Sequence, residues 1–249
     1  MPSTHINLSV GGNNLNKKRV LYIILIFAFV LSCTQLKFTK KLKIPTQSNV
    51  RNSDVIIIDA GHGGFDGGAV ASDGTIEKDI NLNIALILGE LLSINGYDVV
   101  YTRTSDVGTE DDESVNISNR KKSDLKNRLD IMSKHPDSLF ISIHLNKFTA
   151  GTANGAQVFY SPSFDESKKL SAHIQDSIKT NLQPSNNRVI KKGDKNVYLL
   201  YNARVPSVIV ECGFLSNANE LKKLKDPTYQ KQMAFCIFEG IIKYKLQEG

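Results

Sequence analysis

The chain has 249 residues, of which 41% are hydrophobic and 22% charged, so it can bury a sizeable core and should form one globular domain with appendages. Its formal net charge of +6 suggests nucleic-acid binding, but residues 1–53 hold eight Lys and Arg and no Asp or Glu. Subtracting these eight charges leaves −2 for residues 54–249, which excludes a basic surface for nucleic acid on the globular part.

The N-terminal part differs in composition from the rest of the chain. Residues 1–36 are predicted to be a polar tail followed by an apolar membrane or signal segment at 20–36, which three basic residues precede. Its core at 20–33 would span about 21 Å as a helix, less than the roughly 30 Å of a hydrocarbon layer. We expect an uncleaved signal anchor, with a cleaved form, a form lipidated at Cys33 or a buried core helix as alternatives. Residues 37–53 are predicted to be a linker.

From residue 54 onward, short apolar runs alternate with amphipathic stretches. We expect strands at Val55–Asp59, Tyr97–Thr102, Leu139–Ile143, Ala156–Tyr160, Val197–Leu200 and Ser207–Glu211. We expect helices at Glu77–Ile94, Ile117–Ser133, Glu166–Leu182 and Thr228–Leu246. This alternation predicts an α/β fold: a single layered domain whose twisted, mostly parallel (mixed) sheet has helices on both faces. The three cysteines lack a CxxC spacing, so Cys33, Cys212 and Cys236 are expected to be free, mostly buried thiols.

The stretch VIIIDAGHGGFDGGAV, residues 55–70, places a histidine among five glycines at the end of the first predicted strand. A turn needs only one or two glycines, so the others indicate that something approaches this backbone closely. Glycines on both sides of His62 would leave room for a metal and a substrate. The spacing does not fit a phosphate-binding GxGxxG loop, because Asp66 stands where the last glycine belongs.

Four chemically distinctive residues lie at the predicted strand ends or in the loops that leave them. His62 and Glu77 flank the glycine-rich loop, while His144 and Glu211 come at the ends of two later strands. Open α/β sheets gather their ligand sites at this edge. Two histidines and a glutamate would leave tetrahedral Zn²⁺ an open fourth position. Each residue alone also has an ordinary interpretation: a loop or capping histidine, a histidine paired at a strand end, and an acid stabilised by a helix dipole.

Glu211 stands in the apolar segment PSVIVECGF. A carboxylate there would lose hydration or have its pKa raised, which suits a group that accepts a proton and then donates it near neutral pH. Pairing with an arginine or with backbone amides is the alternative.

The segments IDAGHGGFDGGAV, FISIHLN and PSVIVECGFLSNANE, together with Glu77, resemble the zinc-dependent N-acetylmuramoyl-L-alanine amidases of the Amidase_3 type. The resemblance covers residues 55–244. It implies that His62, Glu77 and His144 bind one Zn²⁺ and that Glu211 is catalytic. The reaction implied is hydrolysis of the amide between the lactyl group of N-acetylmuramic acid and L-alanine in peptidoglycan.

The stretch SNRKKSDLKNR and the apolar N-terminal segment look most similar to the CwlD-type amidases of the spore cortex. That likeness implies a part in making muramic-δ-lactam, on the outer face of the cytoplasmic membrane in the spore envelope. It leaves open whether an accessory or activating protein is needed. The residues also allow an inactive amidase-like domain that binds a glycan or a partner, or a zinc hydrolase of another amide.

Several further residues bear on the site. Asp59, Asp66 and Asn146 are candidates for orienting ligands or substrate. Three features depart from the family pattern: Lys147 after His144-Leu145-Asn146, Cys212 after Glu211, and an acidic insert, TEDDES at 109–114, which is expected to be a solvated loop. His135 and His173 have no evident partners and are assigned no role.

Overall fold

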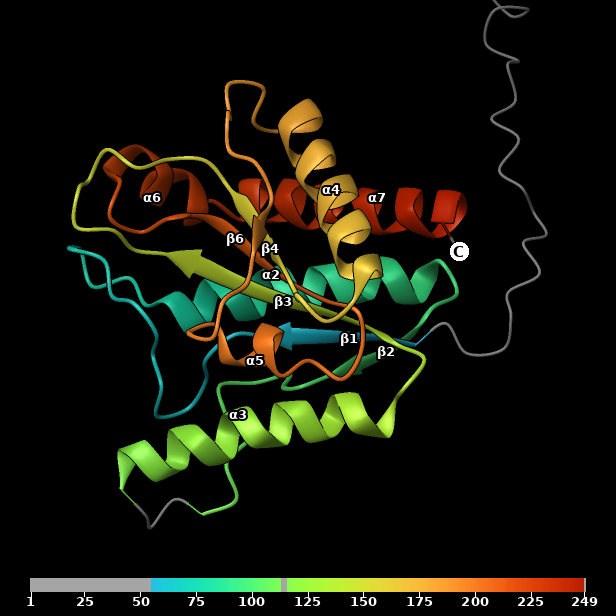
Figure 1. Ribbon diagram of the computed structural model, residues 1–249. Coiled ribbons are helices and arrows are strands. Elements are labelled where there is room, and N and C mark those ends of the chain that lie inside the picture. Colours follow the sequence, from blue (N-terminus) through green and yellow to red (C-terminus); the bar gives the residue numbers. More distant parts are fainter. Residues whose placement is uncertain (1–54, 113–115, 249) are drawn as a thin grey trace, which may run out of the picture. The chain divides into compact units, whose positions relative to one another are not determined.

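The computed structural model describes residues 55–112 and 116–248 (Figure 1). The elements, in chain order, are β1 (Val55–Ala60), α2 (Glu77–Ile94), β2 (Asp98–Tyr101), α3 (Ile117–Lys134), β3 (Leu139–Asn146), β4 (Gln157–Tyr160), α4 (Asp165–Asn181), β5 (Lys191–Lys192), α5 (Tyr198–Tyr201), β6 (Ser207–Phe214), α6 (Ala218–Leu224) and α7 (Pro227–Glu248). The predicted α/β alternation is therefore confirmed. The predicted tail, apolar segment 20–36 and linker 37–53 lie outside the described residues.

The six strands form one mixed sheet in the order β2-β1-β3-β6-β4-β5. Strands β2, β1, β3 and β6 are parallel, whereas β4 runs antiparallel to β6 and parallel to β5. The carboxyl ends of the parallel strands share one edge of the sheet, where such folds bind their ligands. Because β4 runs the other way, its first residue, Gln157, comes to that same edge, opposite Glu211 of β6.

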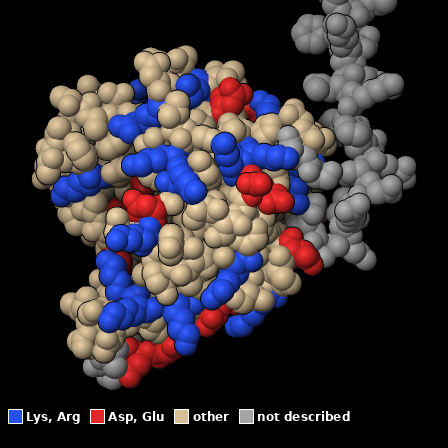
Figure 2. All heavy atoms as spheres, viewed as in Figure 1, with Lys and Arg blue, Asp and Glu red and all other residues tan. Residues whose placement is uncertain are grey.

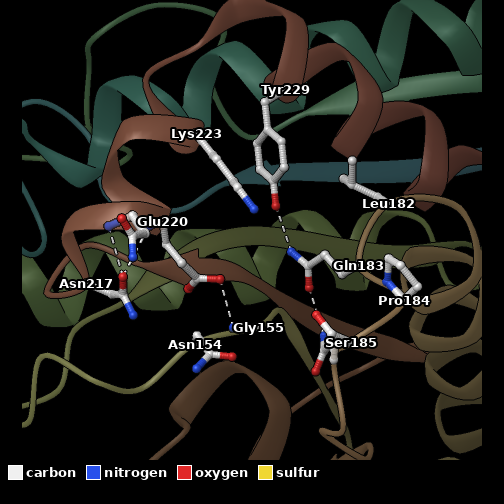
Figure 3. A pocket seen from close by; sticks show the side chains of 12 residues that line it. Asn154, Gly155, Leu182, Gln183, Pro184, Ser185, Asn217, Glu220, Lys223 and Tyr229 are labelled. Atoms are coloured by element: carbon white, nitrogen blue, oxygen red, sulfur yellow. Dashed lines mark hydrogen bonds between the residues drawn. The ribbon is translucent and has the colours of Figure 1, made fainter.

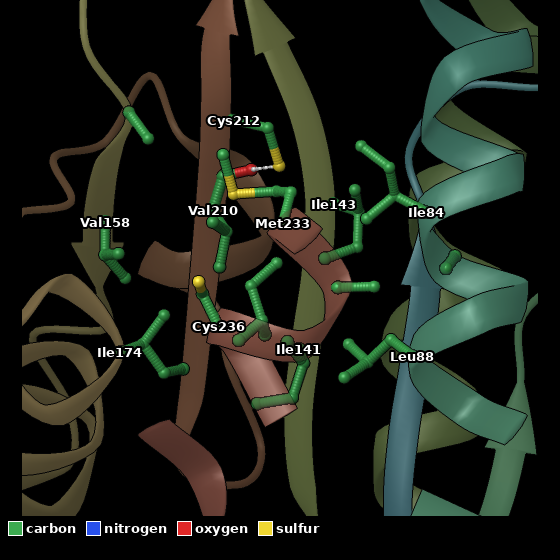
Figure 4. Packing of buried hydrophobic residues seen from close by; sticks show 14 of the residues in the cluster. Ile84, Leu88, Ile141, Ile143, Val158, Ile174, Val210, Cys212, Met233 and Cys236 are labelled. Atoms are coloured by element: carbon green, nitrogen blue, oxygen red, sulfur yellow. Dashed lines mark hydrogen bonds between the residues drawn. The ribbon is translucent and has the colours of Figure 1, made fainter. Parts of the chain in front are cut away.

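Helices cover both faces of the sheet: α2, α4 and α7 lie on one face, and α3 and α5 on the other (Figure 1). Strand β1 supplies both layers because its side chains alternate, with Ile56 and Ile58 in the larger apolar cluster and Ile57 in the smaller one. In the larger cluster, Ile84 and Leu88 of α2 pack toward the sheet (Figure 4). Each side chain of this size stabilises the fold by roughly 1.5–3 kcal/mol when fully buried.

One predicted element is wrong. Val197–Leu200 was expected to be a strand, but Tyr198–Tyr201 form one turn of helix, α5, closed by a bond of 3.0 Å from the Tyr201 N–H to the Val197 carbonyl. Consecutive Leu199 and Leu200 are both buried, which a two-sided strand at the sheet edge would not allow. A short apolar run does not distinguish the two states by periodicity. Helix α6, which Asn217 caps, was not predicted.

Smaller differences concern element ends. Strands β3 and β6 extend to Asn146 and Phe214, so His144 and Glu211 lie inside the strands instead of following them. Ile94 is 74% exposed because α2 ends there.

One further expectation can be compared with the described residues. Cys212 and Cys236 are free and buried, as predicted, and Cys33 lies outside the described part. None of the described helices is long and apolar enough to cross a membrane.

Candidate active site

The glycine-rich loop after β1 folds tightly because its neighbours leave no space for side chains. A Cβ atom at Gly61 would overlap the His144 ring, and one at Gly68, which has φ of 70°, would lie 2.6 Å from Glu77 Oε2. His62 itself has φ of 63°, a left-handed conformation that histidine adopts more readily than most residues. What approaches this backbone is thus the set of side chains predicted to bind metal.

His62, Glu77 and His144 converge from a loop, the start of α2 and the interior of β3. One potential ligand atom from each lies within 4.8 Å of the others. His62 Nε2 is 3.3 Å from Glu77 Oε1, and His144 Nδ1 is 3.1 Å from the same oxygen. The two imidazole rings meet edge to face, with centroids 4.8 Å apart. This is the group that the sequence predicted, and it could hold one metal ion.

Glu77 is fixed by hydrogen bonds to both of its carboxylate oxygens. The backbone N–H of Leu145 donates to Oε1 at 3.0 Å, and that of Ala69 donates to Oε2 at 2.8 Å. Asn81, one helical turn later, also donates to Oε1 at 3.3 Å. Burial alone would raise the pKa of Glu77, but hydrogen bonds from His144 and His62 outweigh it and hold that pKa well below its usual range. Glu77 is therefore ionised at neutral pH.

Asp66 orients His62. Its Oδ2 lies 2.9 Å from His62 Nδ1, which leaves Nε2 facing Glu77. Burial lowers the pKa of His62, yet the bonds to Asp66 and Glu77 prevail and raise it to about 9. Lys121 of α3 lies 3.1 Å from the same Asp66 oxygen. The suggested orienting role of Asp66 thus has a direct contact behind it.

Asp59, the second suggested orienting residue, contacts none of the three predicted ligands through a hydrogen bond. It is fully buried, pairs with Arg128 and accepts a bond of 2.6 Å from the Ser142 hydroxyl. Burial raises the pKa of Asp59, but the Arg128 charge, the hydrogen bond from Ser142 and smaller contributions together lower it below its ordinary value. Arg128 in turn donates to the backbone carbonyl of His62 at 2.9 Å. Asp59 therefore acts on the histidine through Arg128 and the loop backbone.

A second arginine supports the same loop. Arg103 is buried and donates to the carbonyls of Ala60 at 2.9 Å and Gly61 at 3.2 Å. Sequence reasoning missed both Arg103 and Arg128, because each acts over more than forty residues of chain. It also missed Asn81, although its position one turn after Glu77 on a predicted helix was a usable signal. Asn146 pairs with Phe214 across the sheet, and an orienting role for its side chain stays a prediction.

Glu211 lies beside the three predicted metal ligands. Strands β3 and β6 pair in register at His144 and Glu211, so these side chains share one face of the sheet. Glu211 Oε2 is buried and has no hydrogen-bond partner among the described residues. Burial, helped by the negative charge of Glu77, raises the pKa of Glu211 to about 7. Neither an arginine nor a backbone amide in the described part of the chain pairs with Oε2, which removes the alternative raised by the sequence.

The three departures from the family pattern each make structural contacts in the fold. Lys147 donates to the Val70 carbonyl at 2.9 Å and so ties β3 to the glycine-rich loop. Cys212 points into the core. The described part of the acidic insert is not simply a solvated loop, because Thr109 and Glu110 bond to Asp124 and Arg120 of α3.

A separate hollow of about 310 Å³ lies beside the start of α7 (Figure 3). Its polar groups are largely paired with one another: Gln183 donates to the Tyr229 hydroxyl at 2.7 Å, and Glu220 accepts from the Gly155 N–H at 2.8 Å. None of His62, Glu77, His144 and Glu211 lines it. It is therefore not the site described above.

The sequence profile of the Amidase_3 family, described as N-acetylmuramoyl-L-alanine amidase, matches residues 56–243. The chain belongs to this amidase family. It is 34% identical over 228 residues to the germination-specific N-acetylmuramoyl-L-alanine amidase of Bacillus subtilis, covering 92% of this chain and 93% of that protein.

Solved structures of other amidases agree with this assignment. The CwlD amidase of Clostridioides difficile, solved in complex with the GerS lipoprotein, has 44% sequence identity and a TM-score of 0.75 over 78% of this chain and 99% of that one. An N-acetylmuramoyl-L-alanine amidase from Clostridium difficile 630 has 30% identity and a TM-score of 0.68, over 80% of this chain and all of that one. The mixed sheet with helices on both faces is thus the fold of the amidase family.

Proposed function

We propose that this amidase hydrolyses the amide between the lactyl group of N-acetylmuramic acid and L-alanine in peptidoglycan, with Zn²⁺ held by His62, Glu77 and His144. The family assignment supports the reaction, and the convergence of the three side chains supports the metal. The observation that carries the proposal is the buried Oε2 of Glu211, which has no hydrogen-bond partner among the described residues and lies beside that convergence. A domain that only bound glycan would have no use for such a carboxylate.

The three proposed ligands fit zinc in chemistry, and the two separations that involve Glu77 fit it in spacing. Two imidazoles and one carboxylate make a donor set that catalytic Zn²⁺ uses. Ligands about 2.0–2.2 Å from a tetrahedral zinc lie roughly 3.3–3.5 Å from one another. The separations of 3.3 Å and 3.1 Å between the histidine nitrogens and Glu77 Oε1 are close to that value. When bound, Zn²⁺ supplies a Lewis acid that acidifies a water molecule and polarises a substrate carbonyl.

Glu211 moves the protons in the proposed reaction. With a pKa of about 7 it is partly ionised at neutral pH, so it can accept a proton from the attacking water. The same proton then passes to the departing amine of L-alanine as the carbon–nitrogen bond breaks, which regenerates the carboxylate. Glu77, whose pKa lies well below its usual range, keeps its negative charge throughout. The two carboxylates thus divide the work through their different surroundings.

We infer that the cellular setting is the spore cortex, in the pathway to muramic-δ-lactam. The germination-specific relative and the CwlD structure support this setting. The complex of CwlD with a lipoprotein supports the expectation of an accessory protein. Attachment to the outer face of the membrane through residues 20–36 remains part of the proposal.

The decisive experiment is digestion of purified peptidoglycan by the purified full-length protein, with and without a zinc chelator. We expect new amino-terminal L-alanine, detected by amine labelling and mass spectrometry, and its loss on chelation with recovery on adding Zn²⁺. A binding-only domain would pull down peptidoglycan without releasing peptides. A hydrolase of another amide would release a different amino terminus.

A further inference from the structure

Arg188 lies in the loop between α4 and β5, at the opposite side of the candidate site from the glycine-rich loop. Its guanidinium stacks on the ring of Phe214, with the central carbon 4.5 Å from the ring centroid. Its Nε donates to the Asn154 carbonyl at 2.7 Å, and its Nη1 donates to the side-chain oxygen of Gln157 at 3.0 Å. The guanidinium is therefore held in one orientation by an aromatic ring and two neutral acceptors.

The loop that carries Arg188 is itself anchored. Asn186 is buried and donates to the Ala156 carbonyl at 2.8 Å, while its side-chain oxygen accepts from the Arg188 N–H at 2.9 Å. The amide nitrogen of Gln157 donates to the Val189 carbonyl at 2.8 Å. The oxygen and the nitrogen of the Gln157 side-chain amide thus both bond to this loop and hold it beside the start of β4.

Strand pairing puts this arrangement beside the candidate catalytic residue. Gln157 and Glu211 are opposite each other in the antiparallel pair of β4 and β6, so their side chains lie on the same face, with Cβ atoms about 4.5–5.5 Å apart. An irregularity in the pairing of β3 with β6 brings Phe214 opposite Asn146, on the face that also carries His144. Arg188, Gln157 and Phe214 therefore border the same open edge as Glu211.

The positive charge of Arg188 has no counter-ion. Within residues 55–112 and 116–248, no carboxylate forms an ion pair with Arg188, and the two N–H groups of Nη2 have no hydrogen-bond partner. On the face of the molecule shown in Figure 2, by contrast, acidic side chains lie among the Lys and Arg side chains. The Phe214 ring and two neutral acceptors orient the guanidinium without neutralising its charge, which leaves it able to pair with an anionic ligand.

We propose that Arg188 binds a carboxylate of the stem peptide, on the residue that follows L-alanine, and so positions the scissile amide against Glu211. This inference rests on the proposed function. Arg188 bonds to the side chain of Gln157, and Gln157 lies opposite Glu211 in the neighbouring strand, so a short extended peptide can reach from Glu211 to Arg188. Arg188 acts as a positioning residue, because it contacts the peptide beyond the bond that breaks.

The test compares two soluble muropeptides that differ only in whether the α-carboxyl group of the second stem-peptide residue is free or amidated. We expect the zinc-loaded, full-length wild type to cleave the free acid with kcat/KM about 10- to 100-fold higher, mainly through a lower KM. The variant Arg188→Gln should cleave both muropeptides at the rate of the amidated one. Arg188→Lys should recover part of the preference, because a charge without the planar fork binds a carboxylate less well.

Arg204→Gln is the matched control, because Arg204 is exposed and lies away from the site in the loop after α5. It should keep the wild-type preference. Equal cleavage of the two muropeptides by the wild type, or an unchanged preference in Arg188→Gln, overturns the inference while leaving the amidase function in place. An equal loss on both substrates in Arg188→Gln also overturns it, since that result indicates a structural role. Cleavage of neither muropeptide by the wild type overturns the proposed function itself, and the inference with it.

Discussion

The two halves of the candidate site differ in how their polar groups are satisfied. On the side of β1 and α2, Glu77 accepts several hydrogen bonds and His62 is bonded to Asp66. On the side of β6, Glu211 Oε2 is buried without a partner among the described residues. The first half keeps Glu77 ionised and fixes the orientation of the His62 ring, which suits metal ligands. The second half raises the pKa of its carboxyl group to about 7, near neutral pH, which suits proton transfer.

Removing a ligand from the first half should have the largest effect. We expect His62→Ala, in the purified full-length protein, to lose bound zinc and all measurable amidase activity, because two ligands hold zinc far less tightly than three. Elemental analysis and the peptidoglycan assay check this. His135→Ala is the control, since His135 lies at the distant end of α3. A His62→Ala protein that kept one zinc per chain would contradict the ligand assignment.

Changing Glu211 to Gln should separate the two halves. We expect kcat to fall by about 10²- to 10⁴-fold, the usual contribution of a general acid–base, while zinc content stays at the wild-type level. The exposed Glu166 offers a matched control as Glu166→Gln, which should remain fully active. Full activity in Glu211→Gln would show that another group moves the proton.

The raised pKa of Glu211 also predicts a pH-dependent stability. In the metal-free protein the folded state holds this proton up to about pH 7, whereas the unfolded chain releases it near the ordinary value of 4.5. The free energy of unfolding should therefore fall as pH rises between these values, by up to roughly 3 kcal/mol in total. Glu211→Gln removes this fall. Urea unfolding of the chelator-treated wild type and variant from pH 5 to 8 measures it.

The difference between the two proteins is the informative quantity, because it cancels the titration of the groups that do not interact with Glu211. The variant should gain stability relative to the wild type as pH rises. A constant difference across the range would mean that Glu211 ionises normally in the folded state.

The smallest effect is expected at Asp66, which is hydrogen-bonded to His62. Asp66→Asn keeps an oxygen that can accept a hydrogen bond but removes the negative charge, so zinc affinity should fall about 10- to 100-fold. Competition with a chelator of known affinity measures this. Asp165→Asn, an exposed change at the start of α4, is the control. An unchanged affinity in Asp66→Asn would limit the role of Asp66 to folding the loop.

The sequence predicted those parts of the site that lie at strongly patterned positions. His62 and Glu77 flank a glycine-rich loop between a β-branched run and a periodic helix, and both flanking elements could be predicted from that pattern. The position of Glu211 in an apolar segment already indicated a raised pKa. His144 followed from its place near the end of an apolar strand.

Other parts depend on contacts that sequence spacing does not contain. Arg128 reaches Asp59 and the His62 carbonyl only because α3 packs under β1. Arg188 lies in a loop without periodicity, and its approach to Glu211 depends on β4 running antiparallel to β6. The direction of β4 depends on how the chain connects it to its neighbours, and a local sequence pattern does not show these connections. The helical turn at Tyr198–Tyr201 could not be predicted from local pattern either. Its two adjacent leucines are both buried, and this burial depends on the tertiary structure.

The irregular pairing near the end of β6 has an evolutionary consequence. Before it, side chains alternate strictly, so any exchange at Val210 or Cys212 disturbs the interior. Beyond it, the register shifts by one residue, so Phe214 pairs with Asn146 and its side chain lies on the other face from the one that strict alternation would give it. Relatives could therefore vary the residue at this position, and with it the support of Arg188, while the strand before it keeps its alternation. Shortening the strand by one residue at Gly213 would remove this independence.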